Sequence, residues 1–222
     1  DAPGALSHLL LGLTTLWGLR LSLHLWTRWR AHGEDPRYEK IMRSVMEKKG
    51  WSWSKTSLQS VFLTQAPLLF ITCLPAQLGI AYSDGANTAL GPLAFAGAII
   101  AIIGILFETI GDAQLNAFRA DPANKGKVLD NGLWRYTRHP NYFGDACTWW
   151  GIWLIACETG LPGWISIIGP IFLTFTLTRW SGKPLLERGM KKTRPGYAEY
   201  VARTSGFFPL RSEERRVGKE CR

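Results

Sequence analysis

Long apolar stretches alternate with short polar or charged stretches along this chain of 222 residues. Five of them approach the length of about 20 residues that a helix needs to cross a hydrocarbon core about 30 Å thick. They comprise residues 6–26, 57–81, 89–107, 142–157 and 164–180, the fourth being the shortest. Several Trp residues lie near the segment ends, as is typical of membrane interfaces. The pattern predicts an all-α fold, a polytopic bundle of transmembrane helices.

Basic residues are confined to alternate connections between these segments. Outside the C-terminal tail, every Lys and Arg except Arg20 lies within residues 28–55, 119–138 or 179–203, whereas residues 83–87 and 158–160 contain none. The positive-inside rule then predicts that all three basic regions face the cytosol and that the chain starts on the outside. Contact with anionic lipid is an alternative that stays open for any single lysine of these loops.

The two ends and the composition set the domain boundaries. Residues 211–222 resemble a sequencing adaptor read in frame, so we expect residues 1–210 to be a single membrane-embedded domain followed by a non-native tail. The tail holds five basic and three acidic residues, which leaves +7 of the formal net charge of +9 outside it. The four Cys residues show no spacing typical of a metal site or a disulfide framework.

Ionisable residues within apolar segments are the first candidates for chemistry. The third segment continues without a helix breaker, and spacings of four and seven place Glu108, Asp112 and Arg119 on one face. Arg20 and His24 lie one turn apart in the first segment and should face the bundle. The alternatives left open are an interfacial ion pair for Asp112 and snorkelling of His24 to the membrane surface.

A second group of candidates precedes and opens the fourth segment. Asp130-Asn131-Gly132 is typical of a turn, and Pro140 predicts an extended His139 followed by a helix that begins at Pro140. Arg135, Arg138 and His139 would then lie at a helix N-terminus, an arrangement that favours an anion. Asp145 would face inward from the first turn. A helix cap with interfacial anchors is the alternative.

The third group lies near the C-terminus. Tyr197 and Tyr200 are three residues apart and Arg203 follows them, which predicts an aromatic and cationic stripe. Such a stripe can stack a nucleic base or lie on the membrane surface, and the spacing favours neither.

Together these motifs resemble the membrane-embedded steroid 5-alpha-reductase-like family, in its bacterial branch of unknown function (DUF1295), which is related to sterol reductases and isoprenylcysteine methyltransferases. The resemblance covers about residues 10–209. It rests on an ordered set of motifs, namely Leu-Trp-Gly-Leu-Arg at 16–20, Gly-Glu-Asp-Pro-Arg-Tyr at 33–38, Asp112 with Arg119, residues 132–145, Tyr-Ala-Glu-Tyr at 197–200 and Phe-Phe-Pro at 207–209.

The resemblance implies a seven-helix bundle, from which this chain would lack the first two helices. It implies a bacterial inner-membrane enzyme that binds NADPH from the cytosol and transfers hydride to a conjugated C=C of a lipophilic, steroid- or isoprenoid-like enone. The catalytic residues implied are Asp145, Tyr142 and Glu108. The implied cofactor contacts are Arg37, Tyr38, Asp112, Arg119, Arg135, Tyr136, Arg138, His139, Asn141, Tyr197 and Arg203.

One open question and two alternative functions accompany this interpretation. Trp17 occupies the position of a family Tyr that precedes the Arg corresponding to Arg20, which leaves the proton donor open. Membrane methyltransferases that use S-adenosylmethionine share an Arg-His-Pro-x-Tyr-x-Gly element, although their Glu-Glu pair corresponds here to Glu187-Arg188. A non-catalytic membrane protein is the third hypothesis. We expect a lipophilic small-molecule substrate and membrane lipid as partners, and no nucleic acid.

Overall fold

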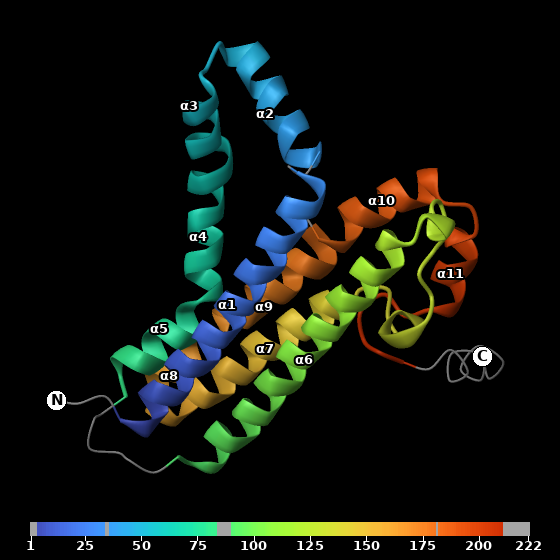
Figure 1. Cartoon of the computed structure of the whole chain (residues 1–222). Helices are drawn as coiled ribbons and strands as arrows, with labels where there is room; N and C mark the ends of the chain where they lie inside the picture. Colours follow the sequence, from blue (N-terminus) through green and yellow to red (C-terminus); the bar gives the residue numbers. More distant parts are fainter. Residues whose placement is uncertain (1–3, 34–35, 84–89, 181, 211–222) are drawn as a thin grey trace, which may run out of the picture.

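A computed structural model of the chain describes residues 4–33, 36–83, 90–180 and 182–210 (Figure 1). The regular structure of these residues is helical and contains no strand, only an isolated bridge between Thr137 and Ser205. This confirms the predicted all-α fold. The proposed tail, residues 211–222, lies outside the described residues.

Among the described residues, three helical runs are long and apolar enough to span a membrane. They are α1 (Ala5–His32), α6 (Pro92–Ala120) and the run Leu161–Thr193, which contains α8 (Leu161–Ile165), α9 (Ile168–Phe175), the π-helix η5 (Thr176–Trp180) and α10 (Lys183–Thr193). They confirm that the chain has the character of a membrane protein.

A fourth span is broken by a bend. It runs through α3 (Trp53–Ser57), the π-helix η1 (Leu58–Phe62), α4 (Leu63–Thr72) and α5 (Leu74–Ala81), with a bend of 54° between Thr72 and Leu74. Pro75 in the first turn of α5 has no backbone N–H, so the hydrogen-bond ladder is interrupted where the chain bends. The predicted second segment is therefore not one straight helix but is bent between α4 and α5.

Helix α7 (Pro140–Ala156) is the short fourth segment and begins at Pro140, as its sequence predicts. It is the central helix, because it packs against α1, α5, α6 and α9. The remaining elements are α2 (Pro36–Lys49), α11 (Tyr197–Arg203) and the 3-10 turns η2 (Pro122–Asn124), η3 (Gly132–Arg135) and η4 (Cys157–Thr159).

Helices α6 and α7 are in close contact at glycine residues. A Cβ atom on Gly104 would lie 2.5 Å from the carbonyl oxygen of Gly144, and one on Gly144 would lie 2.6 Å from the carbonyl oxygen of Gly104. Small residues allow such close contact between helices in membranes, where no hydrophobic effect drives association. This close pair holds in register the acidic residues of α6 and the Asn141–Asp145 turn of α7.

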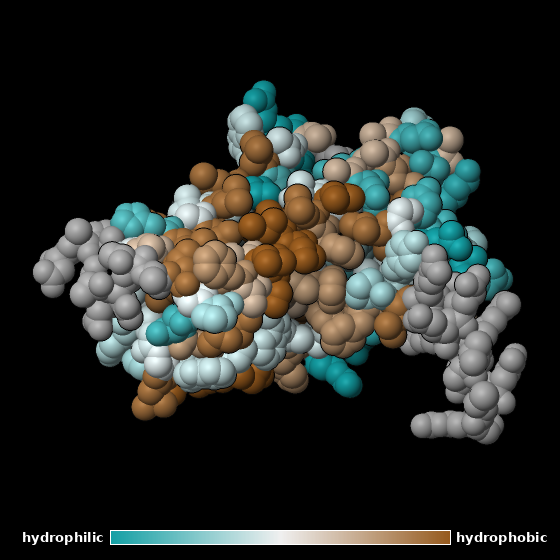
Figure 2. Space-filling view, turned by 90° about the horizontal axis from the view of Figure 1, so that it is seen from below, coloured by the Kyte–Doolittle hydropathy of each residue, from teal (hydrophilic) through white to brown (hydrophobic). Residues whose placement is uncertain are grey.

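The bundle has two different ends. Figure 1 shows the start of α1, α5 and α8 at one end, and α10, α11 and the connection from α6 to α7 at the other. Large apolar side chains such as Phe70, Phe95 and Ile99 are exposed on the outside, and Figure 2 shows one face where apolar residues gather. An exposed apolar surface of this kind suits contact with lipid acyl chains.

Candidate functional site

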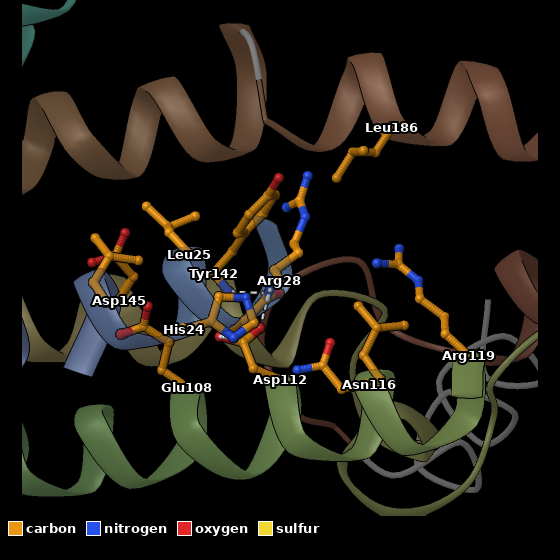
Figure 3. Close-up of a pocket in the computed structure, with 13 residues that line it drawn as sticks. His24, Leu25, Arg28, Glu108, Asp112, Asn116, Arg119, Tyr142, Asp145 and Leu186 are labelled. Carbon is orange, nitrogen blue, oxygen red and sulfur yellow. Dashed lines mark hydrogen bonds and ion pairs between the residues drawn. The ribbon is translucent and has the colours of Figure 1, made fainter. Parts of the chain in front are cut away.

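A polar cavity of about 420 Å³ lies between α1, α6, α7 and Leu186 of α10 (Figure 3). Arg28 near the end of α1, Arg119 near the end of α6 and Asn141 at the start of α7 all line it, so the cavity lies at the end of the bundle that carries the basic loops. Its other polar lining residues are His24, Glu108, Asp112, Asn116, Tyr142 and Asp145.

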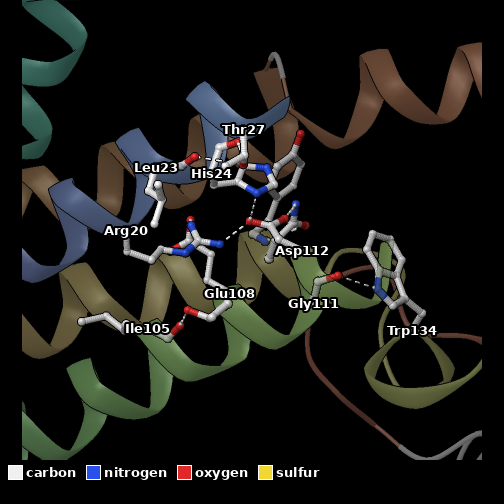
Figure 4. A network of polar contacts seen from close by, with 12 residues as sticks. Arg20, Leu23, His24, Thr27, Ile105, Glu108, Gly111, Asp112 and Trp134 are labelled. Atoms are coloured by element: carbon white, nitrogen blue, oxygen red, sulfur yellow. Dashed lines mark hydrogen bonds and ion pairs between the residues drawn. The ribbon is translucent and has the colours of Figure 1, made fainter. Parts of the chain in front are cut away.

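Arg20 organises the acidic side of this cavity. Its guanidinium group donates to Glu108 and to Asp112, which lie one turn apart on α6 (Figure 4). Asp112 also accepts a hydrogen bond from Asn141 Nδ2 at 3.2 Å, and His24 Nδ1 lies 3.7 Å from its Oδ2 atom. Arg20 and His24 thus face the bundle, because the carboxylates of α6 supply their partners.

The acidic residues farther from the basic loops have buried polar atoms without partners. Glu108 Oε2 and Asp145 Oδ1 accept no hydrogen bond. The Trp17 indole lies beside Asp145, yet its Nε1 atom makes no hydrogen bond of normal geometry. Buried polar atoms are nearly always paired, and those left unpaired are common at functional sites. Glu108 and Asp112 share one guanidinium group and Asp145 lines the same cavity, an arrangement in which a carboxyl group can hold and donate a proton.

A smaller cavity of about 160 Å³ adjoins the larger one. The two share Leu115, Arg119, Asn141 and Leu186 as lining residues. The remaining lining of the smaller cavity is aromatic, apolar or basic and includes no carboxylate: Phe118, Leu129, Trp134, Arg138, His139, Met190, Arg194, Tyr197 and Tyr200. The two cavities therefore form one elongated site whose parts differ in charge.

Tyr197 and Tyr200 of α11 form a wall of the smaller cavity. Tyr200 donates its hydroxyl hydrogen to the carbonyl of Trp134 at 2.6 Å, whereas the buried hydroxyl of Tyr197 lies beside Arg138 and makes no hydrogen bond of normal geometry. Burial raises the pKa of Tyr197 to about 12, so the phenol stays neutral and can donate to a ligand. The Trp134 indole is fixed by a bond of 3.1 Å from its Nε1 atom to the carbonyl of Gly111.

Arg138 is bonded mainly to the protein itself. Its Nε atom donates to Glu187 of α10 at 2.9 Å, and one terminal nitrogen donates to the carbonyls of Val201 and Thr204 at 3.1 and 2.5 Å. Its backbone N–H donates to the carbonyl of Ser205 at 2.9 Å. Arg138 therefore ties α10 and α11 to the start of α7, which uses most of the donors that the sequence interpretation assigned to an anion.

His139 shares the Glu187 carboxylate. Its Nε2 atom lies 3.2 Å from Glu187 Oε1 and must carry the hydrogen, because a carboxylate only accepts. Burial lowers the pKa of His139, and the bond to Glu187 offsets only part of this effect, so the imidazole is neutral. Its ring stacks on Tyr142 with the centroids 5.2 Å apart.

Several residues predicted to bind the cofactor lie away from both cavities. Arg135 is exposed, Tyr136 is half-buried, and neither lines a cavity. Tyr38 is exposed and accepts a hydrogen bond from Gln65 at 2.7 Å. Arg37 lies in α2, and its side chain is outside the described part of the structure.

The predicted stripe of Tyr197, Tyr200 and Arg203 does not form. Both tyrosines point into the protein, whereas Arg203 is exposed and pairs with Asp130. Conversely, the sequence interpretation gave no role in the site to Arg28, Asn116, Leu186 or Arg194, all of which line a cavity. A helical signal existed for two of them, since Arg28 and Asn116 each follow a singled-out residue, His24 or Asp112, by four positions.

Comparison with known proteins agrees with the resemblance in part. A stretch of 110 residues is 30% identical to "Probable O-methyltransferase ustE" of Ustilaginoidea virens and covers 50% of this chain but only 38% of that protein. No solved structure matches the chain. The family described as "Protein of unknown function (DUF1295)" matches residues 4–204. Because this match covers most of the chain, the protein belongs to the DUF1295 family.

Proposed function

We propose that this protein is a membrane-bound, NADPH-dependent reductase that saturates the conjugated C=C of a lipophilic, steroid- or isoprenoid-like enone. The observation that carries the proposal is the contrast between the two adjoining cavities. The smaller offers arginines and aromatic rings without a carboxylate, and the larger offers carboxyl groups at its far end. A dinucleotide with an anionic, adenine-bearing half and a neutral reactive ring requires such a pair of environments.

The smaller cavity and the shared lining fit the anionic half. Arg119 and Arg194 would hold phosphate oxygens, because guanidinium groups make charge-assisted hydrogen bonds to phosphate. Trp134 and Tyr200 would contact the adenine ring, since aromatic side chains stack on bases. Arg28 adds a third cation from the larger cavity.

The far end of the larger cavity suits the chemical step. When bound, NADPH supplies a hydride to the β carbon of the enone, and the α carbon then takes a proton to give the saturated ketone. Asp145 and Glu108 are the groups of this chain that can donate that proton, since each has a buried oxygen without a partner. Arg20 holds Glu108 and Asp112 in place. The Trp17 indole lies beside Asp145, at the position where the resemblance places a Tyr.

An apolar substrate fits the remaining surroundings. Leu21 and Leu25 of α1 and Leu186 of α10 line the larger cavity between its charged groups. Helices α1 and α6 beside it are apolar enough to cross a membrane, from which a lipophilic substrate would come. Under this proposal the site lies on the cytosolic side of a bacterial inner membrane, an orientation that the basic loops favour.

The test is reduction by the purified full chain. We expect NADPH to be consumed in step with the formation of a saturated product from a panel of lipophilic enones, and deuteride from labelled NADPH to appear at the β carbon. Asp145→Asn should reduce turnover by about 10²–10⁴-fold and leave NADPH binding intact. A chain that binds no NADPH with saturation contradicts the proposal.

A second candidate is transfer of a methyl group from S-adenosylmethionine. Two observations favour it, namely the partial similarity to a protein named as an O-methyltransferase and the carboxyl groups that could face a sulfonium cation. Labelled methyl transfer to lipid or prenylcysteine extracts by the purified chain, without any reduction of enones, would establish this function in place of the first.

A further inference from the structure

Helices α2 and α3 form a hairpin that neither cavity uses. Figure 1 shows α2 leaving the line of α1 and meeting α3 at an apex outside the packed bundle. Helix α2 packs mainly against α3, with Met42 buried, and Tyr38 is bonded to Gln65 of α4. Because the hairpin joins two apolar spans, it lies where the chain leaves the hydrocarbon and passes through the headgroup region.

Helix α2 is amphipathic. Tyr38, Ile41, Met42 and Val45 follow the spacing of one helical face. Lys40 and Arg43 lie off that face and are exposed. A helix with apolar residues on one side and Lys or Arg on the other is typical of segments that lie in the plane of the membrane interface.

The turn after α2 concentrates positive charge beside an aromatic ring. The ammonium groups of Lys49 and Lys55 lie 4.3 and 4.9 Å from the centroid of the Trp51 ring. Residues 36–57 contain six basic and two acidic residues. Tryptophan prefers the headgroup level of a bilayer, so the ring fixes two cations at the depth of lipid phosphates.

We propose that the α2–α3 hairpin, residues 36–57, is a binding surface for the headgroups of anionic phospholipids. The excess of cations complements a lipid with net negative charge, whereas a zwitterionic lipid offers no net charge to the hairpin. The polar face of α2 is the side that meets the headgroups, and Lys49 and Lys55 beside the Trp51 ring add two cations where α2 ends.

The experiment uses the full chain in mixed micelles of phosphatidylglycerol and phosphatidylcholine, with retained lipid counted by native mass spectrometry. We expect phosphatidylglycerol to be enriched on the wild type. Lys49→Glu with Lys55→Glu should lower the enrichment by about tenfold or more, because each basic residue near anionic lipid contributes about fivefold. The matched control is Lys125→Glu with Lys127→Glu, two exposed lysines of another basic loop, and it should retain the enrichment.

A milder pair, Lys49→Gln with Lys55→Gln, replaces the charge reversal if that variant does not fold, and it should also lower the enrichment. Equal retention of the two lipids by the wild type overturns the proposal. Equal loss of phosphatidylglycerol in the hairpin and control variants overturns it as well, since the effect would then follow total charge and not the hairpin.

Discussion

The two adjoining cavities differ in the chemistry of their walls although they share four residues. Glu108, Asp112 and Asp145 line the larger cavity, Arg20 donates to the first two, and one oxygen each of Glu108 and Asp145 has no partner. The smaller cavity has arginines and aromatic rings, and its buried wall is fixed by Arg138, His139 and Glu187. The larger cavity therefore suits proton transfer, and the smaller cavity suits an anionic, aromatic ligand.

The largest effect on the acidic cavity should come from Arg20→Met. This change leaves Glu108 and Asp112 buried without their cation, and breaking a buried ion pair costs about 3–5 kcal/mol. Chemical unfolding in detergent measures the loss. The matched control is Arg43→Met, which breaks an exposed pair with Glu39 and should cost less than about 1 kcal/mol. Equal losses in the two variants would show that the acids do not depend on Arg20.

The close contact between α6 and α7 should be the next most sensitive. Gly144→Ala adds a Cβ atom 2.6 Å from the backbone of Glu108 and Gly104, so α6 and α7 must separate, at a cost of about 1–3 kcal/mol. Ligand binding should weaken with it. Gly18→Ala is the control, since its Cβ meets nothing within 4 Å and helix propensity predicts a slight gain. A stable Gly144→Ala protein would contradict the close packing of these helices.

Arg119→Ala tests the part of the site that would bind the anionic half of the ligand. Hydrogen bonds to charged groups contribute about 1.5–3 kcal/mol, so NADPH affinity should fall by about 10–100-fold while the thermal midpoint stays near that of the wild type. The control Arg135→Ala removes an exposed arginine that lines neither cavity and should bind NADPH as the wild type does. An equal fall in both variants would indicate a general charge effect.

The smallest effect should be a pH dependence from His139. Burial lowers the pKa of His139 from its ordinary value of 6.5, so near and below that value the unfolded chain binds more protons than the folded chain. The stability that the neutral imidazole contributes is present above pH 6.5 and is lost as the pH falls through it. His139→Gln should therefore unfold with a weaker pH dependence than the wild type between pH ~8 and ~5.

Much of the fold follows from local patterns. All five apolar segments contain helices, α6 continues past Phe107 to Ala120, and α7 begins at Pro140. Arg20 and His24 face inward because charged groups in an apolar helix need partners. The break between α4 and α5 was not expected, although Pro75 marked it in the sequence.

The role of Arg138 was not predictable, since its partners lie far along the chain. Glu187, Val201 and Thr204 follow it by 49 to 66 positions, and no local spacing relates them. The same long-range packing turns Tyr197 and Tyr200 inward and leaves Arg203 outside. Local spacing finds residues that share a helix face, but it does not find the neighbour that each face will meet.

Competitive binding to the purified full chain tests the central claim most directly. A titration with NADPH, followed by displacement with S-adenosylmethionine, measures which ligand the paired cavities accept. NADPH should bind with saturation, and S-adenosylmethionine should displace it poorly. Arg119→Ala should weaken the binding of NADPH by about 10–100-fold. Tight binding of S-adenosylmethionine, with no saturable binding of NADPH, would contradict the central claim.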